Sequence, residues 1–203
     1  LLTGNVPFYI ENNTNILKTS GELDYETDAS YNITVRSTDD DGLFLDKTFT
    51  INVININEVS TDITLDGTDV DESQISGTVV GTFETIDPDN NNTVTYTLTN
   101  NVNDVPFEIS GNVLRTTREL NYEGGDQSYN INVTSNDGEN TISREFTITV
   151  NNINETPTDI VLTKTHDAVN GNVQIGYLVG TFSTSDEDAN SSSFNYTLNT
   201  NDV

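Results

Sequence analysis

The segment SYNINVTS, residues 128–135, alternates the apolar side chains of Tyr129, Ile131 and Val133 with polar residues. The segment EFTITV (145–150) follows with the same alternation. A period of two with one apolar face indicates a half-buried β-strand. No stretch of the chain sustains the 3.6-residue period of an amphipathic helix. The two segments therefore predict a pair of antiparallel strands in an all-β protein.

Both segments occur a second time, nearly a hundred residues earlier. Further matched pairs of strand-like segments follow at a similar spacing, so the whole chain consists of copies of one repeat. A unit of about a hundred residues with some seven short strands has the size of an immunoglobulin-like sandwich. The sequence therefore predicts tandem immunoglobulin-like Greek-key β-sandwiches of about seven strands per repeat. The matched segments are SYNITVRS (30–37), TFTINV (48–53), TVTYTL (93–98) with FNYTL (194–198), and GTVVGTF (77–83) with GYLVGTF (176–182).

The repeats are out of phase with the chain. Residues 59–155 form one complete repeat, residues 1–58 match only its C-terminal half, and residues 156–203 match only its N-terminal half. We expect the chain to be one segment of a longer array of repeats. The alternative is that the two halves complete a sandwich together, within one chain or between chains, because half a sandwich leaves an apolar face uncovered.

The charge excludes several classes of function. The 203 residues carry 33 acidic and 7 basic side chains, a net charge of −26, which opposes nucleic-acid binding and suits a bound cation. The alternative is that the acidic residues only keep a surface protein soluble. The chain has no cysteine, and we expect no signal peptide and no membrane-spanning segment.

Acidic and amide residues gather at the ends of the predicted strands. The octapeptide INEVSTDI (56–63) returns as INETPTDI (153–160), and Glu58 and Glu155 are 97 residues apart. Other polar strings recur in the same order: LDYE (23–26) and LNYE (120–123), DPD (87–89) and DED (186–188), STDDDG (37–42) and SNDG (135–138), and, once, VDESQISGTVV (70–80).

Together these strings resemble the cadherin repeat, of the type found in large bacterial surface proteins. Each string alone is weak evidence, but five of them occur in the family's order, and the resemblance covers essentially the whole chain. The resemblance implies that Ca2+ binds at each linker between repeats, held by oxygen ligands of the kind calcium prefers. The ligands implied at the first junction are Asp24, Glu26, Asn55, Asn57, Glu58, Asp87, Asp89 and Asp137. Those implied at the second are Glu72, Asn121, Glu123, Asn152, Asn154, Glu155, Asp186 and Asp188.

Two departures from the family pattern affect the expected affinity. The linker acid is glutamate where the family usually has aspartate. Asn121 replaces Asp24 in the second copy and removes one charge, so we expect weaker binding at the second junction. Each acidic string also has a plainer interpretation, since Asp, Asn and Pro favour turns without any ligand.

The sequence gives little support for catalysis. There is no cysteine nucleophile, and the single histidine, His166, lies in a predicted loop. The resemblance implies a calcium-binding segment of an extracellular or cell-surface adhesion or stalk protein, stiffened by calcium at its linkers. Its partner would be another cell surface, a polysaccharide or the same protein. The alternatives are a carbohydrate-binding module and a filament or sheath subunit assembled through the half repeats.

Overall fold

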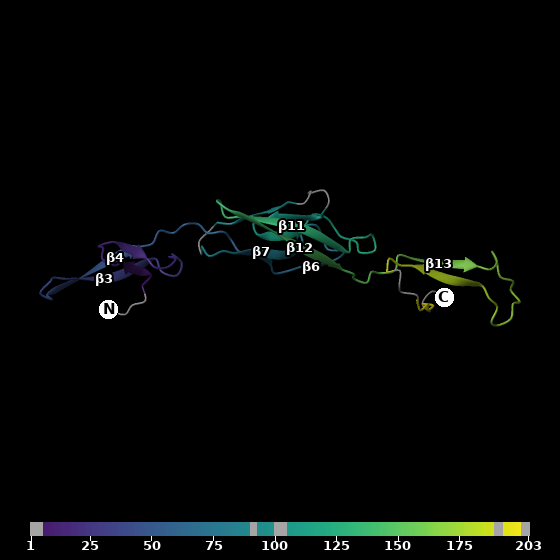
Figure 1. Ribbon diagram of the computed structural model, residues 1–203. Helices are drawn as coiled ribbons and strands as arrows, with labels where there is room; N and C mark the ends of the chain where they lie inside the picture. The colour runs from purple at the N-terminus through teal and green to yellow at the C-terminus, as the bar shows by residue number, and fades with distance from the viewer. Residues whose placement is uncertain (1–5, 90–92, 100–104, 189–192, 200–203) are drawn as a thin grey trace. The chain divides into compact units, whose positions relative to one another are not determined.

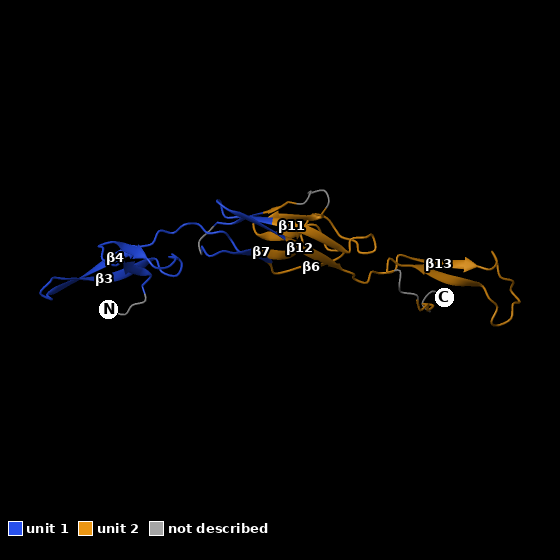
Figure 2. Ribbon diagram, in the orientation of Figure 1, with its two compact units in different colours: residues 1–64, 84–96, 134–144 blue, residues 65–83, 97–133, 145–203 orange. Residues whose placement is uncertain are grey.

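The computed structural model describes residues 6–89, 93–99, 105–188 and 193–199, and these residues contain strands and turns but no helix (Figure 1). They form two compact units, residues 1–64, 84–96 and 134–144, and residues 65–83, 97–133 and 145–203 (Figure 2). Five strands of the central repeat run from one unit into the other, so the division falls across the middle of that repeat.

The central repeat, residues 59–155, contains eight strands among its described residues. They form two four-stranded sheets, with the orders β5-β7-β10-β9 and β6-β12-β11-β8. Strand β6 runs parallel to β12, with Val70 opposite Val150, while β10 is antiparallel to both β7 and β9. The strands are β5 (Asp62–Leu65), β6 (Asp69–Asp71), β7 (Val79–Ile86), β8 (Thr95–Leu98), β9 (Phe107–Ser110), β10 (Val113–Thr116), β11 (Ser128–Asn136) and β12 (Thr141–Asn151).

The core of the second unit is built by the residues that the alternation marks as apolar. Ile131 and Val133 are fully buried, while the neighbouring Asn130 and Asn132 are exposed, which confirms the predicted strand. The two sheets meet here, and the rings of Phe83 and Phe146 lie 5.6 Å apart between centroids. The other buried apolar residues of this unit are Val70, Val80, Val105, Phe107, Leu114, Leu120, Ile148 and Val150.

The N-terminal residues of the first unit repeat the strands of the second half of the central repeat. Strands β3 (Ser30–Thr38) and β4 (Phe44–Asn52) pair in antiparallel register, and β1 (Phe8–Ile10) pairs with β2 (Leu17–Thr19) (Figure 1). A cavity of about 630 Å³ lies between β1, β2 and β3. In the central repeat the corresponding strands β9 and β10 join a sheet with β7, and the residues described before β1 supply no such strand.

The C-terminal residues of the second unit form one antiparallel pair, β13 (Asp159–Lys164) and β14 (Gly180–Ser185). These strands correspond to β5 and β7. The expectation that FNYTL (194–198) forms a strand is wrong, because these residues have no strand conformation. Its counterpart β8 pairs with β11, and residues 156–203 contain no segment like β11 that could serve as the neighbour.

Burial of equivalent leucines predicts very different stability effects. Leu114 in β10 is 0% exposed, whereas Leu17, its counterpart in β2, is 41% exposed. Leu114→Ala is therefore expected to lower the free energy of unfolding by about 2–5 kcal/mol, and Leu17→Ala by less than about 1.5 kcal/mol. Urea denaturation of the two variants measures this, and equal losses would contradict the described packing.

Candidate metal centres

Three carboxylates from separate segments of the first unit come together as a first cluster, defined by Glu26, Glu58 and Asp89. Each offers an oxygen, and these oxygens all lie within 4.8 Å of one another. Glu26 lies in the turn before β3, Glu58 in the linker between β4 and β5, and Asp89 directly after β7. Three carboxylates at this spacing repel one another unless a cation or protons compensate their charge.

Hydrogen bonds to two aspartate carboxylates tie the linker to the turn that follows β7. The amide of Glu58 donates to Oδ2 of Asp89 over 2.7 Å, and the hydroxyl of Ser60 donates to Oδ2 of Asp87 over 2.6 Å. The amide of Asp89 in turn donates to Oδ1 of Asp87 over 2.8 Å. This Asp-x-Asp turn therefore fixes the linker glutamate beside Asp89.

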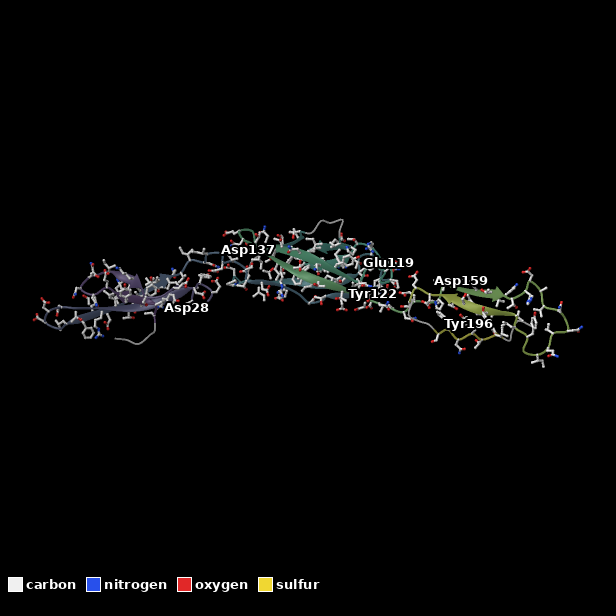
Figure 3. All side chains as sticks on the ribbon, turned by 45° about the vertical axis from the view of Figure 1, so that its right-hand side comes forward. Asp28, Glu119, Tyr122, Asp137, Asp159 and Tyr196 are labelled. Atoms are coloured by element: carbon white, nitrogen blue, oxygen red, sulfur yellow. The ribbon has the colours of Figure 1, made fainter. Side chains whose placement is uncertain are left out.

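Two other predicted ligands of the first junction are held by their own turns. The carboxylate of Asp137, in the turn after β11 (Figure 3), accepts hydrogen bonds from the amides of Glu139 and Asn140. These bonds, with that of Asn140 the stronger, lower the pKa of Asp137, and the side-chain amide of Asn57 also donates to it over 3.2 Å. The carboxylate of Asp24 accepts both hydrogen bonds of Thr27, which lower its pKa.

The second unit contains a second cluster, defined by Glu72, Glu123 and Glu155, whose carboxylate oxygens also lie within 4.8 Å of one another. Glu72 follows β6 and is only 1% exposed. Its two carboxylate oxygens accept the backbone amides of Tyr122, over 2.6 Å, and of Ile153, over 2.8 Å. A single buried side chain thus connects the turn that carries Glu123 (Tyr122 is labelled in Figure 3) with the linker that carries Glu155.

The second linker repeats the hydrogen bonds of the first. The amide of Glu155 donates to Oδ2 of Asp188 over 2.9 Å, and the amide of Asp188 donates to Oδ1 of Asp186 over 3.1 Å. Asn154 donates to the carbonyl of Glu155, as Asn57 does to that of Glu58. Two linkers built from similar residues therefore present a glutamate in the same way.

The charge of the linker glutamates is poorly compensated. Desolvation, followed by the nearby carboxylates, raises the pKa of Glu58 and of Glu155. Both carboxylate oxygens of Glu155 are enclosed and accept no hydrogen bond. An enclosed carboxylate without donors, facing two others, is the donor set that a hard cation such as calcium takes. The residues present therefore fit a calcium ion.

The structure does not join every predicted ligand to a cluster. Asn55 is exposed in the linker, and no described interaction connects it to the first cluster. Asn152 donates its side-chain amide to Glu123, and Asn121 donates its own to Glu187 over 3.1 Å. Both asparagines therefore donate hydrogen bonds from their side-chain NH2 groups to carboxylates.

Sequence reasoning missed two residues that support these turns. Ser60 is buried and bonds Asp87, but its counterpart in the second linker is Pro157, so the repeat gave no signal. Glu187 bonds Asn121, but its counterpart in the first copy is Pro88. Both interactions are particular to one junction.

Comparisons with known proteins agree with the architecture. Residues 67–151 match the cadherin domain family. No sequence among the curated proteins matches the chain. Cadherin domains are a non-enzymatic family, which agrees with the expectation that this segment is not an enzyme.

Solved structures share the fold over most of the chain. PcdhgB3 EC1-4 is 26% identical, with a TM-score of 0.64 over 75% of this chain and 39% of that one. The protocadherin gammaB7 EC3-6 cis-dimer is 20% identical, with a TM-score of 0.67 over 91% of this chain and 49% of that one. Human CDH23 EC21-23 is 18% identical, with a TM-score of 0.65 over 92% of this chain and 63% of that one. The chain thus spans less than two thirds of each of these structures.

Proposed function

We propose that this chain, whose residues 67–151 form a cadherin domain, is a calcium-binding segment of an extracellular adhesion or stalk protein. The observation that carries the proposal is the enclosed carboxylate of Glu155, which faces Glu72 and Glu123 and accepts no hydrogen bond. The first cluster supports it, because Glu58 is bonded to Asp89 as Glu155 is to Asp188. We also propose the domain limits 1–58, 59–155 and 156–203.

The carboxylates of the two clusters are the proposed core of each calcium site. Glu26, Glu58 and Asp89 would hold calcium at the first junction, and Glu72, Glu123 and Glu155 at the second. Bound calcium would supply positive charge and six to eight coordination positions for oxygen. The proposed further ligands are Asp24, Asn55, Asn57, Asp87, Asp137, Asn121, Asn152, Asn154, Asp186 and Asp188.

The chain's own residues explain how binding would act mechanically. Each linker glutamate is positioned by a hydrogen bond from its amide to the aspartate of the following Asp-x-Asp turn. Glu26 of the first cluster, and Glu72 and Glu123 of the second, come from segments on the other side of the linker. Without compensating charge these groups repel one another, and the linker is expected to hinge. With their charge compensated, the carboxylates hold the linker to both sides.

The location and partners belong to the same proposal. The match to the cadherin domain supports the extracellular or cell-surface location that we propose. The described residues contain no helix with the length and apolarity of a membrane span. The partners we propose are calcium and another cell surface or the same protein. The bacterial origin that the motifs suggest stays a hypothesis, since the similar structures include protocadherins and human CDH23.

A filament subunit is a second candidate, favoured by uncovered apolar side chains. Phe182 in β14 is 47% exposed, whereas its counterpart Phe83 in β7 is 2% exposed. Leu17 differs from Leu114 in the same way. Residues 1–58 and 156–203 correspond to complementary halves of one repeat, so this candidate predicts self-association that Phe182→Asp abolishes in analytical ultracentrifugation.

Small-angle X-ray scattering tests the mechanical part of the proposal. We expect the scattering curve of the full chain to change when calcium is chelated and to recover when calcium is restored, because the linkers hinge when the carboxylates repel. Magnesium at the same concentration is the control for charge screening, since it demands six ligands in near-ideal octahedral geometry. Identical curves with calcium and with chelator would contradict calcium-dependent stiffening.

A further inference from the structure

A network of hydrogen bonds closes the turn between β10 and β11, beside the second cluster. The guanidinium of Arg118 donates to both carboxylate oxygens of Asp126, over 2.6 and 2.8 Å. Asp126 also accepts the hydroxyl of Tyr129 and, over 3.0 Å, the backbone amide of Asn121. The Asp126 side chain is 14% exposed and that of Arg118 is 52% exposed, and paired hydrogen bonds between a guanidinium and a carboxylate are stronger than those between neutral groups.

The same turn carries two of the proposed calcium ligands. Its backbone is closed by the amide of Asp126, which donates to the carbonyl of Asn121 over 3.0 Å. Glu123, two residues beyond Asn121, contributes its carboxylate to the second cluster. Between them, the amide of Tyr122 donates to Glu72 of that cluster. Whatever fixes this turn therefore also fixes the position of Glu123.

The first repeat holds its corresponding turn differently. Asp24 there accepts both the amide and the hydroxyl of Thr27, whereas its counterpart Asn121 accepts the amide of Gly124 and no hydroxyl, and Gly21 stands where the second repeat has Arg118. In the second repeat, Gly124 and Gly125 replace Thr27, so the turn is one residue longer and lacks the threonine hydroxyl. Glycine increases the conformational freedom of a turn and so the entropy lost when the turn is ordered.

We infer that Arg118 is a positioning residue for the second junction: through Asp126 it holds the glycine-containing turn so that Glu123 stays beside Glu72 and Glu155. The inference rests on the proposed function, because it concerns the affinity of the second cluster for calcium. Arg118 contacts none of the three carboxylates of that cluster among the described interactions. Its effect is therefore through the turn.

The variant Arg118→Gln tests this inference with two measurements. In calcium-free protein, hydrogen exchange of the peptide covering residues 119–127 is expected to be faster than in the wild type. In calcium titration, the second site is expected to bind about tenfold more weakly, the usual cost of removing a residue that orients a metal ligand. Arg118→Lys keeps the charge but not the paired hydrogen bonds, and is expected to recover part of both effects.

The matched control is Arg36→Gln. Arg36 also donates to both oxygens of an aspartate, Asp46, over 2.7 Å each, and is as exposed as Arg118. Arg36 lies in β3 and pairs with Asp46 on β4, outside the ligand-bearing turns. Loss of this pair is expected to leave calcium affinity and the exchange of residues 119–127 unchanged.

The outcomes separate the inference from the function on which it rests. If wild-type protein binds no calcium, the proposed function fails, and hydrogen exchange in calcium-free protein still decides whether Arg118 holds the turn. Unchanged exchange in Arg118→Gln would overturn the hydrogen-bonded restraint. Faster exchange with unchanged calcium affinity would overturn the positioning role.

Discussion

Replacing Glu72 with alanine is expected to destabilise the calcium-free protein by about 2–4 kcal/mol. The side chain is 1% exposed and accepts the backbone amides of Tyr122 and Ile153. Alanine would remove the acceptor of both amides, each such loss costs about 1–3 kcal/mol, and relief of the repulsion between Glu72 and Glu155 offsets part of the sum. Urea denaturation in the presence of chelator measures the effect.

The substitution is also expected to remove calcium-dependent stabilisation at the second junction. Glu72 is one of three carboxylates in the second cluster, so alanine removes a third of its formal charge. Glu72→Gln is the control, because its side chain is nearly the same size and its amide oxygen can still accept one of the two amides. We expect the free energy of unfolding of Glu72→Gln to lie between that of the wild type and that of Glu72→Ala. A Glu72→Ala variant as stable as the wild type would show that the two amides do not depend on this side chain.

Replacing Glu155 with glutamine is expected to change stability in opposite directions with and without calcium. Desolvation, followed by the neighbouring carboxylates, raises the pKa of Glu155, so its ionised form destabilises the calcium-free fold. Glutamine removes that repulsion and should raise the melting temperature in chelator. With calcium, glutamine removes a charged ligand and should lower the melting temperature.

The pH dependence of the Glu155 effect has a definite sign. Because the pKa is higher in the folded than in the unfolded chain, folding takes up protons and stability falls as the pH rises through the two values. The gain from Glu155→Gln in chelator should thus be small near pH 4 and complete at neutral pH. Glu108→Gln is the control, since Glu108 is exposed on β9 and outside both clusters. If the melting temperature of Glu155→Gln equals that of Glu108→Gln under all conditions, the electrostatic account is contradicted.

The strands could be predicted from sequence because a period of two records which side chains face the core. Ile131 and Val133 are buried as their spacing indicates. The prediction failed at FNYTL (194–198), because strand formation also requires a neighbouring strand that alternation within a segment does not report. A repeat shows which segments correspond, but it does not show which ones find a partner.

The members of the two clusters could also be predicted, because the acidic strings resemble those of the cadherin repeat, which implied these residues as ligands. The structure brings together Glu26, Glu58 and Asp89, and likewise Glu72, Glu123 and Glu155. The supporting residues could not be predicted in this way. Arg118 has a glycine as its counterpart, and its role depends on a side chain eight residues further along the chain. An interaction that occurs in just one copy of the repeat cannot be detected by comparing the copies.

Calcium titration by isothermal calorimetry on chelated wild-type protein, with Glu155→Gln and Glu108→Gln in parallel, tests the central claim most directly. The account predicts heat that saturates at more than one ion per chain for the wild type and for Glu108→Gln. It predicts that Glu155→Gln loses the heat of calcium binding at the second junction and keeps the heat of binding at the first. No heat from the wild type at millimolar calcium, or the same isotherm for all three proteins, would contradict the claim that these carboxylates are calcium ligands.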